Sequence, residues 1–161
     1  MVELDVAYIR TPKHLVRQML RLAEVRRGDV LFDLGAGDGR ILIEAARAFG
    51  AQVTGVEIDP GRVSRIEERL KSTGVKGKVI LANFMDVDLS SADVVAIYLS
   101  DSVNAKLEPK LKHELKQGAR VVSLDYPLPG WAPEKEFVAK GVVPRKVFLY
   151  KISKERDTIS T

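Results

Sequence analysis

The chain of 161 residues contains no cysteine and only two histidines, His14 and His113. The lack of cysteine excludes a disulfide framework, a thiol nucleophile and a cysteine metal site. Two histidines are too few for a histidine-rich metal centre, so we expect no bound metal. No apolar stretch approaches the length that spans a membrane, and residues 1–10 lack the layout of a signal peptide. We therefore expect a cytoplasmic protein without membrane partners.

Neither sign of charge is strongly in excess. There are 26 basic and 22 acidic residues, a net charge of +4 with a pI near 9.3. Such an excess permits an RNA partner but does not establish one, and a solvated surface of mixed charge is the simpler explanation. High charge without cysteine is typical of thermophilic proteins. The length suits one domain, residues 1–161, for which we expect a monomer.

The most informative segment is residues 30–40, Val-Leu-Phe-Asp-Leu-Gly-Ala-Gly-Asp-Gly-Arg. An apolar run of strand length is followed by glycines at alternate positions and then by a helix-like stretch, which is typical of nucleotide-binding α/β proteins. The dinucleotide fingerprint needs a third glycine where Arg40 stands, so the spacing disfavours a nicotinamide cofactor. The candidate ligand contacts in this turn are Gly35, Ala36, Gly37, Asp38 and Gly39.

Acidic residues surround the turn. Asp33 and Asp38 flank it, and Glu57 ends the next apolar run. A pyrophosphate would be repelled by these carboxylates, whereas the cationic, phosphate-free S-adenosylmethionine suits them. Glu57 is placed to accept both ribose hydroxyls, and Asp33 to hold the methionine ammonium. The helix N-terminus after Gly39 can take the methionine carboxylate.

Strand-like and helix-like runs alternate from Val30 to about Val122, which predicts a mostly parallel sheet with helices on both faces. Thr11 and Pro12 read as the N-cap and first residue of an earlier helix, and Pro109 is expected to break or restart a later one. The last two strand candidates lie too close together for a crossover and should form an antiparallel hairpin. The expected parts are a helical segment 11–27, a cofactor-binding half 28–92, an acceptor-side half 93–152 and a tail 153–161. The expected strands are 30–33, 52–57, 78–83, 93–99, 119–125, 137–138 and 146–152.

A parallel sheet that ends in an antiparallel hairpin is the arrangement of the class I, Rossmann-like methyltransferases, with seven strands. The chain resembles this superfamily in residues 33–40 and 55–58. More narrowly, it is similar to archaeal broad-specificity protein-lysine methyltransferases and their mitochondrial relatives, over about Tyr8 to Ile152. The segments that carry this narrower resemblance include Thr11-Pro12, Asn83-Phe84, residues 107–111 (Leu-Glu-Pro-Lys-Leu) and Pro129-Gly130-Trp131.

The resemblance implies a complete cofactor site for S-adenosyl-L-methionine, which would leave as S-adenosyl-L-homocysteine. Ile58, Asn83 and Phe84 would lie near adenine, with the Asn83 carbonyl accepting from the adenine amino group. Tyr8 and Thr11, near the first helix, would close over the cofactor. Asn83 could also be an ordinary turn residue, and Phe84 a core residue.

The acceptor is harder to predict. The fourth strand ends Tyr98-Leu99-Ser100-Asp101, without the Asn/Asp-Pro-Pro-aromatic motif of enzymes that methylate base amino groups. The fifth ends in an acid followed by an aromatic, as the family does. Tyr98, Asp125, Tyr126 and Trp131 could form a slot for a lysine side chain through cation–π attraction and one carboxylate. Alternatively, Trp131 packs the loop and Asp125 is a surface turn residue.

The resemblance favours methyl transfer to exposed lysines of protein substrates, with a broad range because little chain remains beyond the core. An RNA or small-molecule methyltransferase is the alternative, and a cofactor-binding module without catalysis is a third reading. A neutral amine must attack, and the sequence names no general base.

Overall fold

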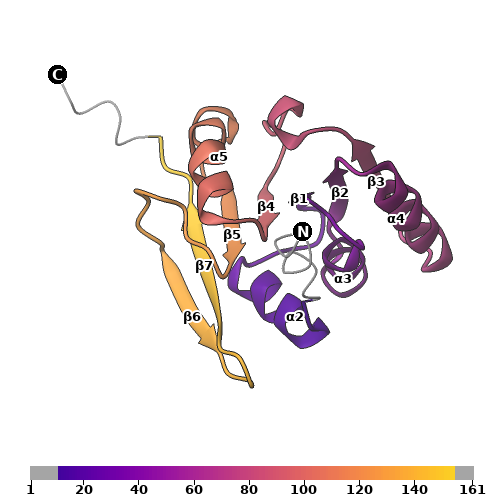
Figure 1. The fold of residues 1–161 in the computed structure, drawn as a ribbon, viewed down its shortest axis with the longest axis horizontal. Coiled ribbons are helices and arrows are strands. Elements are labelled where there is room, and N and C mark those ends of the chain that lie inside the picture. The colour runs from indigo at the N-terminus through magenta and orange to yellow at the C-terminus, as the bar shows by residue number, and fades with distance from the viewer. Residues whose placement is uncertain (1–10, 155–161) are drawn as a thin grey trace.

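A computed structural model describes residues 11–154 and shows one mixed sheet of seven strands (Figure 1). The strand order is β3-β2-β1-β4-β5-β7-β6, with β1 to β5 parallel and β7 antiparallel to both of its neighbours. This confirms the predicted fold class, including the C-terminal hairpin. The strands are β1 Val30–Leu34, β2 Gln52–Glu57, β3 Gly77–Leu81, β4 Val94–Ile97, β5 Arg120–Leu124, β6 Lys135–Ala139 and β7 Arg145–Lys151.

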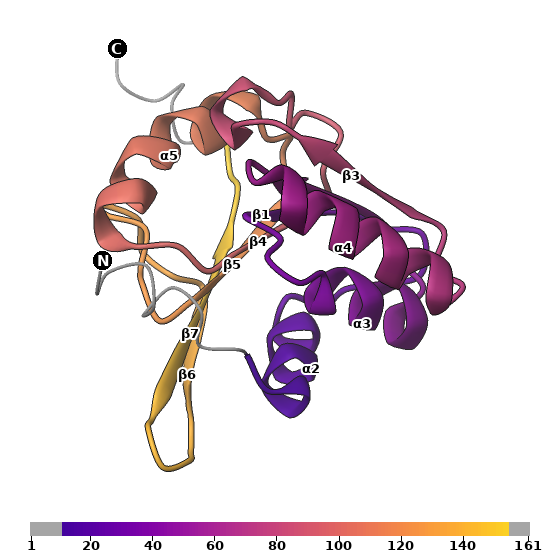
Figure 2. The ribbon, with the colours of Figure 1, turned by 45° about the vertical axis from the view of Figure 1, so that its right-hand side comes forward.

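Helices cover both faces of the sheet. Three of them, α2, α3 and α4, lie side by side on one face, and α5 lies on the other (Figure 2). The three share one apolar cluster with the strands, whereas α5 contributes Leu107 and Leu111 to a second cluster. The helices are α2 Lys13–Leu22, α3 Arg40–Phe49, α4 Pro60–Ser72 and α5 Asp101–Glu114, and η1 is a 3-10 turn, Phe84–Asp86.

The apolar stripes of the sequence explain this packing. Leu15, Val16, Met19 and Leu20 share one face of α2 and are each 1% exposed. Residues at such helical spacing lie on one side of a helix, so burying them fixes the helix against the sheet. Strands between two helical layers are buried on both faces, which is why residues 94–97 form an uninterrupted apolar run.

The glycine turn after β1 folds back onto the neighbouring strand. The amides of Gly35 and Ala36 both donate to the Val56 carbonyl oxygen, at 2.8 and 3.1 Å. Gly55 makes this approach possible, since a Cβ there would lie 2.7 Å from Leu42 Cδ1 and 3.0 Å from Ala36 Cβ. The turn lies where the strand order reverses between β1 and β4, the usual ligand position in such sheets.

Two local predictions were wrong. Pro12, not Thr11, is the N-cap of α2, and no side chain caps that helix; the Pro12 carbonyl oxygen instead accepts from the Leu15 and Val16 amides. Pro109 does not break α5, which runs through it. Pro109 and Ala105, whose carbonyl loses its helical donor, are both exposed, so water can replace the missing hydrogen bond.

Within residues 11–154, none of the helices combines the length and the apolar character needed to cross a membrane.

We predict that Gly55→Ala lowers the free energy of unfolding by about 1–3 kcal/mol, because the added methyl forces Leu42 and the glycine turn apart. Chemical denaturation measures this change. Gly141→Ala is the matched control: its Cβ would meet only the Val143 carbonyl oxygen, at 3.7 Å, so stability should change by less than about 0.5 kcal/mol. Equal effects at both positions would contradict the close packing at Gly55.

Candidate functional site

Two buried carboxylates lie at the ends of adjacent strands. Asp33 is next to last in β1 and Glu57 ends β2, and the two are 3% and 4% exposed. Burial, followed by the negative charges of Asp38 and Glu57, raises the pKa of Asp33 to about 7. A carboxyl in such surroundings favours a cationic partner, because a nearby positive charge stabilises the ionised carboxylate and so offsets both burial and the neighbouring negative charges.

Glu57 is held by backbone amides on either side. Its Oε1 accepts from the Gly37 amide at 3.1 Å, and its Oε2 accepts from the Asp59 amide at 3.0 Å. Arg62 Nη1 lies 3.9 Å from Oε1. Asp59 in turn caps α4 by accepting from Gly61, with Pro60 as the first helical residue. A carboxylate offers about four acceptor positions, so Glu57 can still accept from ligand hydroxyls.

Asp38 has a different environment from that of the other two acids. Its carboxylate accepts from Arg40 Nη2 at 2.6 Å and lies 3.6 Å from Arg69 Nη1. Burial opposes ionisation, but the hydrogen bonds and charge of Arg40 outweigh it and lower the pKa of Asp38. Arg40 also donates to the Thr11 carbonyl oxygen at 2.6 Å, which joins the start of α2 to the turn. Asp38 is therefore paired with arginine, and the acids left for a cationic ligand are Asp33 and Glu57.

The glycine turn provides a backbone cradle. Gly35, Gly37 and Gly39 all have positive φ, at 77°, 60° and 80°. Within residues 11–154, a Cβ on Gly37 would meet nothing closer than 3.9 Å, so no described residue fills the space beside it. Asp38 Oδ1 accepts from the first amide of α3, at 3.1 Å, so that part of the helix N-terminus is already capped. The open turn between two buried acids fits the cationic S-adenosylmethionine better than a diphosphate.

The predicted adenine contacts follow β2 and β3. Ile58 is 66% exposed, so its apolar side chain is accessible to a ligand. Asn83 caps η1, its Oδ1 accepting from the Met85 amide at 3.0 Å, and Phe84 packs partly into the second apolar cluster. Both sequence interpretations of Asn83 therefore remain open, since its carbonyl has one acceptor position left. Tyr8, the other predicted contact, lies outside the described residues.

Three of the four predicted acceptor residues lie together. The rings of Tyr98 and Tyr126 stack with centroids 6.5 Å apart. Burial raises the pKa of Tyr98, and the negative charge of Asp125 acts in the same direction, against the opposing charge of Arg145. Asp125 has a left-handed backbone, φ 67°, which turns the chain out of β5. We call Tyr98, Asp125 and Tyr126 the acceptor slot.

Trp131 packs in the loop, the second of the two roles that the sequence allowed, and Arg145 lies in the slot. The indole N–H of Trp131 donates to Glu108 on α5 at 2.7 Å, and its ring packs edge-on against Tyr150, so its described contacts lie away from the slot. Arg145 enters the slot instead: its Nε lies 2.8 Å from Asp125 Oδ2, and its guanidinium is 5.3 Å from the Tyr98 ring centroid. Arg145 was not predicted from the sequence, since only the register of β5, β6 and β7 brings it to Asp125.

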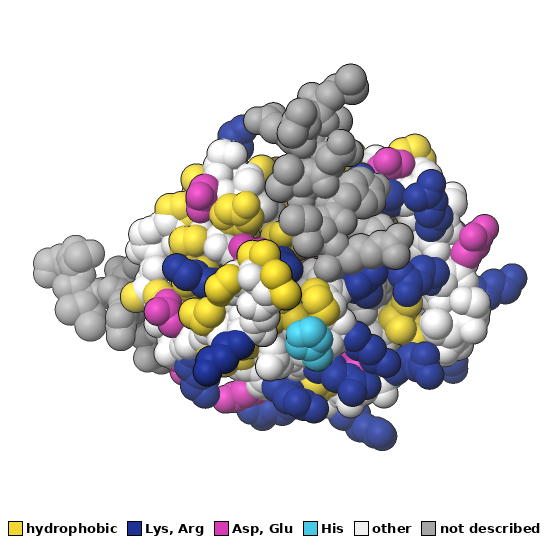
Figure 3. All heavy atoms as spheres, turned by 60° about the horizontal axis from the view of Figure 1, so that its bottom comes forward, with side chains coloured by type: hydrophobic (Ala, Val, Ile, Leu, Met, Phe, Trp, Pro, Cys, Tyr) yellow, Lys and Arg dark blue, Asp and Glu magenta, His cyan; other side chains and the backbone are white. Residues whose placement is uncertain are grey.

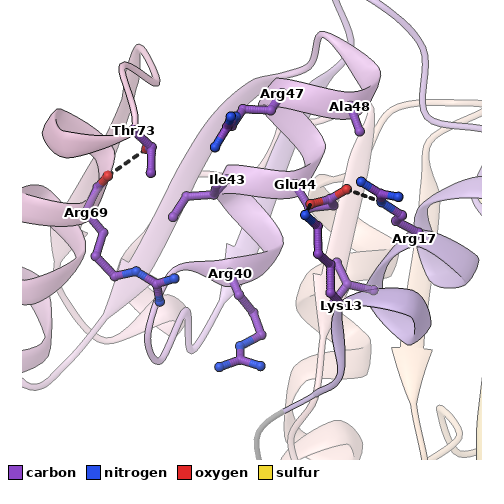
Figure 4. Close-up of a pocket in the computed structure, with 10 residues that line it drawn as sticks. Lys13, Arg17, Arg40, Ile43, Glu44, Arg47, Ala48, Arg69 and Thr73 are labelled. Atoms are coloured by element: carbon purple, nitrogen blue, oxygen red, sulfur yellow. Dashed lines mark hydrogen bonds and ion pairs between the residues drawn. The ribbon is translucent and has the colours of Figure 1, made fainter.

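A basic pocket of about 550 Å³ lies on the outer side of α2, α3 and α4 (Figure 4). Among the described residues that line it, Glu44 is the one acid, and this side chain pairs with Arg17 and, at 4.0 Å, with Lys13. Figure 3 shows the face on which α2 lies, where lysine and arginine side chains gather. The pocket adjoins the glycine turn only through Arg40 and Arg69. Its cationic lining residues are Lys13, Arg17, Arg40, Arg47 and Arg69.

The family model for the ANTKMT methyltransferase domain matches residues 33–135, more than half of the chain. The chain belongs to this methyltransferase family. The matched range begins at Asp33 and includes the glycine turn, Glu57 and the whole acceptor slot.

Curated relatives carry lysine methyltransferase names. A protein-lysine N-methyltransferase of Saccharolobus islandicus is 41% identical, with 94% of this chain and 96% of that protein covered. The adenine nucleotide translocase lysine N-methyltransferase of mouse is 32% identical over 99% of this chain and 69% of its own length. A rat lysine N-methyltransferase named for ATP synthase is 33% identical over 79% of this chain. This chain spans only 59% of the rat protein's length.

A solved structure from Salinibacter ruber, described as an RNA methyltransferase in complex with S-adenosyl-L-homocysteine, has a TM-score of 0.87. It is 42% identical, with 91% of this chain and 95% of that one covered. TrmN of Thermus thermophilus, at 22% identity and a TM-score of 0.77 over 91% of this chain and 51% of its own, shares the fold.

We predict that Asp33→Asn stabilises the ligand-free protein above pH 7. The pKa of Asp33 is about 7 in the folded chain against about 3.8 for an ordinary aspartate, so the folded state binds the proton more tightly. Stability is therefore undiminished below about pH 4, falls between pH 4 and pH 7, and stays low above pH 7. A shift of about three units corresponds to at most about 4 kcal/mol, so a gain of about 2–4 kcal/mol is expected at pH 8.

Chemical denaturation at pH 4 and pH 8 measures this difference. Asp93→Asn is the control of opposite sign: although burial opposes ionisation, hydrogen bonds from Lys116 and the Val30 amide lower the pKa of Asp93. Its removal should destabilise the protein at pH 8. An Asp33→Asn protein no more stable than the wild type at pH 8 would contradict the assigned environment of Asp33.

Proposed function

We propose that this protein transfers the methyl group of S-adenosyl-L-methionine to the ε-amino group of protein lysines. The observation that carries the proposal is the 41% identity to an archaeal protein-lysine N-methyltransferase, which extends over nearly all of both chains. The two buried acids beside an open glycine turn support the cofactor. We further propose a broad range of lysine substrates, action as a monomer in the cytoplasm, and residues 1–161 as one domain.

The cofactor-binding roles follow from the charges of the site. Asp33 would pair with the methionine ammonium, Glu57 would accept from the ribose hydroxyls, and the open side of Gly37 would admit the ligand. Ile58 would cover one face of the adenine. The bound cofactor would supply an activated methyl group on a sulfonium, and the protein's contribution is to align the acceptor amine and exclude water.

The slot has a charge balance suited to an amine nucleophile. A free lysine has a pKa of about 10.4, and it must lose its proton before it attacks. An unpaired Asp125 would stabilise the ammonium and oppose that loss. Because Arg145 already pairs with Asp125 at 2.8 Å, the two charges cancel, and the acceptor can lose its proton to water and attack as the neutral amine. The stacked tyrosines would flank its apolar stem.

RNA methylation is the second candidate, since the Salinibacter ruber protein is described as an RNA methyltransferase and the pocket over α2, α3 and α4 is basic. Arginine side chains in a groove can bind phosphates without reading bases. The acceptor slot does not support RNA methylation, because Arg145, the cation described there, is paired with Asp125 and its charge is already offset.

A methyl-transfer assay on separated protein and RNA fractions decides between lysine and RNA methylation. We expect label from S-adenosyl-L-methionine to appear in protein, on lysine, when the enzyme is incubated with the protein and RNA fractions of a source-cell extract. Amino-acid analysis of the labelled fraction identifies methyl-lysine. Label confined to RNA would overturn the lysine proposal, and a protein that binds the cofactor without labelling either pool would be a binding module.

Glu57→Gln tests the ribose assignment. We expect cofactor affinity measured by calorimetry to fall by about 1.5–3 kcal/mol, because a charged acceptor of two hydrogen bonds becomes a neutral one. Glutamine retains one acceptor for the Gly37 amide, so the fold is preserved better than with alanine. Glu44→Gln is the control. Glu44 is also buried, but it pairs with Arg17 in the basic pocket, so this variant should bind the cofactor normally. Unchanged affinity in Glu57→Gln would rule out the ribose role.

A further inference from the structure

Exposed valines mark the tip of the β6–β7 hairpin. Val142 is fully exposed, Val143 is 69% exposed, and Val138, on β6, is 54% exposed. Single exposed apolar residues are common, but three within six residues of one projecting hairpin offer apolar surface for a contact. We call Val138, Val142 and Val143 the valine tip.

The valine tip adjoins the acceptor slot. Pairing of β5 with β7 ends at Leu124↔Val147, but pairing of β6 with β7 continues to Ala139↔Arg145. The hairpin therefore extends beyond the carboxyl end of β5 and projects from the sheet (Figures 1 and 2). Arg145, the last paired residue, contacts Asp125 and Tyr98. Only Pro144 separates it from Val143, so a molecule seated on the tip would lie beside the slot.

We infer that the valine tip docks onto an apolar side chain of the protein substrate near its target lysine, an inference that rests on the proposed lysine methyltransferase function. Valine side chains offer nothing to phosphates, which need cations or amide donors. They gain free energy when they exclude water against other apolar groups, whatever the sequence of the partner. Contact of this kind would therefore suit a broad range of protein substrates.

The test separates docking from chemistry. Fluorescein-labelled β-casein, an unfolded protein with apolar residues and lysines, measures docking by anisotropy in the presence of S-adenosyl-L-homocysteine. The tripeptide Gly-Lys-Gly with blocked ends, too small to cover the hairpin, measures chemistry as kcat/KM. For the double variant Val142→Ser/Val143→Ser we expect the casein Kd to rise about tenfold, because two valines lose apolar burial. The kcat/KM for the tripeptide should stay within twofold of that of the wild type.

Lys140→Gln is the matched control, since it removes a charge from the same hairpin and leaves the valines in place. It should leave casein binding unchanged. The inference is overturned if the valine variant binds casein like the wild type, if it loses tripeptide activity to the same extent, or if Lys140→Gln alone weakens binding. Valine-dependent casein binding without methylation of its lysines would support the docking surface while refuting the proposed function.

Discussion

The site depends on the burial of Asp33 beside Glu57. Burial is the main cause that raises the pKa of Asp33 to about 7, and the negative charges of Asp38 and then Glu57 act in the same direction. The ligand-free fold thus contains a group whose ionisation costs stability, a cost that a positively charged ligand would offset. Proteins hold such groups where function needs them, because elsewhere a neutral residue would be more stable.

The rest of the turn keeps the two acids in position. Glu57 is fixed by the Gly37 and Asp59 amides, and Gly55 allows the turn to lie against β2. Arg40 neutralises Asp38 and joins the turn to the backbone at Thr11. A single arginine therefore links the first described helix to the cofactor side of the sheet, while a second one, Arg145, balances the charge of Asp125 on the acceptor side.

The sequence predicted the features that arise from local patterns. Apolar runs placed the strands, including Gln52–Glu57 with its correct bounds, and the glycine spacing placed the turn. What it missed depends on tertiary geometry. The sequence around Asp38 does not indicate that its carboxylate turns toward Arg40 and Arg69. Arg145 reaches Asp125 only through the register of the β6–β7 hairpin. The sequence left two roles open for Trp131, and its hydrogen bond to Glu108 on α5 places it in the packing of the loop.

The most direct measurement is proton release on cofactor binding, by calorimetry at pH 6.0 in buffers of different ionisation enthalpy. With a pKa of about 7, Asp33 is mostly protonated at that pH, whereas an adjacent ammonium would ionise it. Binding of S-adenosyl-L-methionine should therefore release nearly one proton, and Asp33→Asn should abolish the release. Binding at pH 6.0 without proton release would contradict the role of Asp33 as the buried partner of the ammonium.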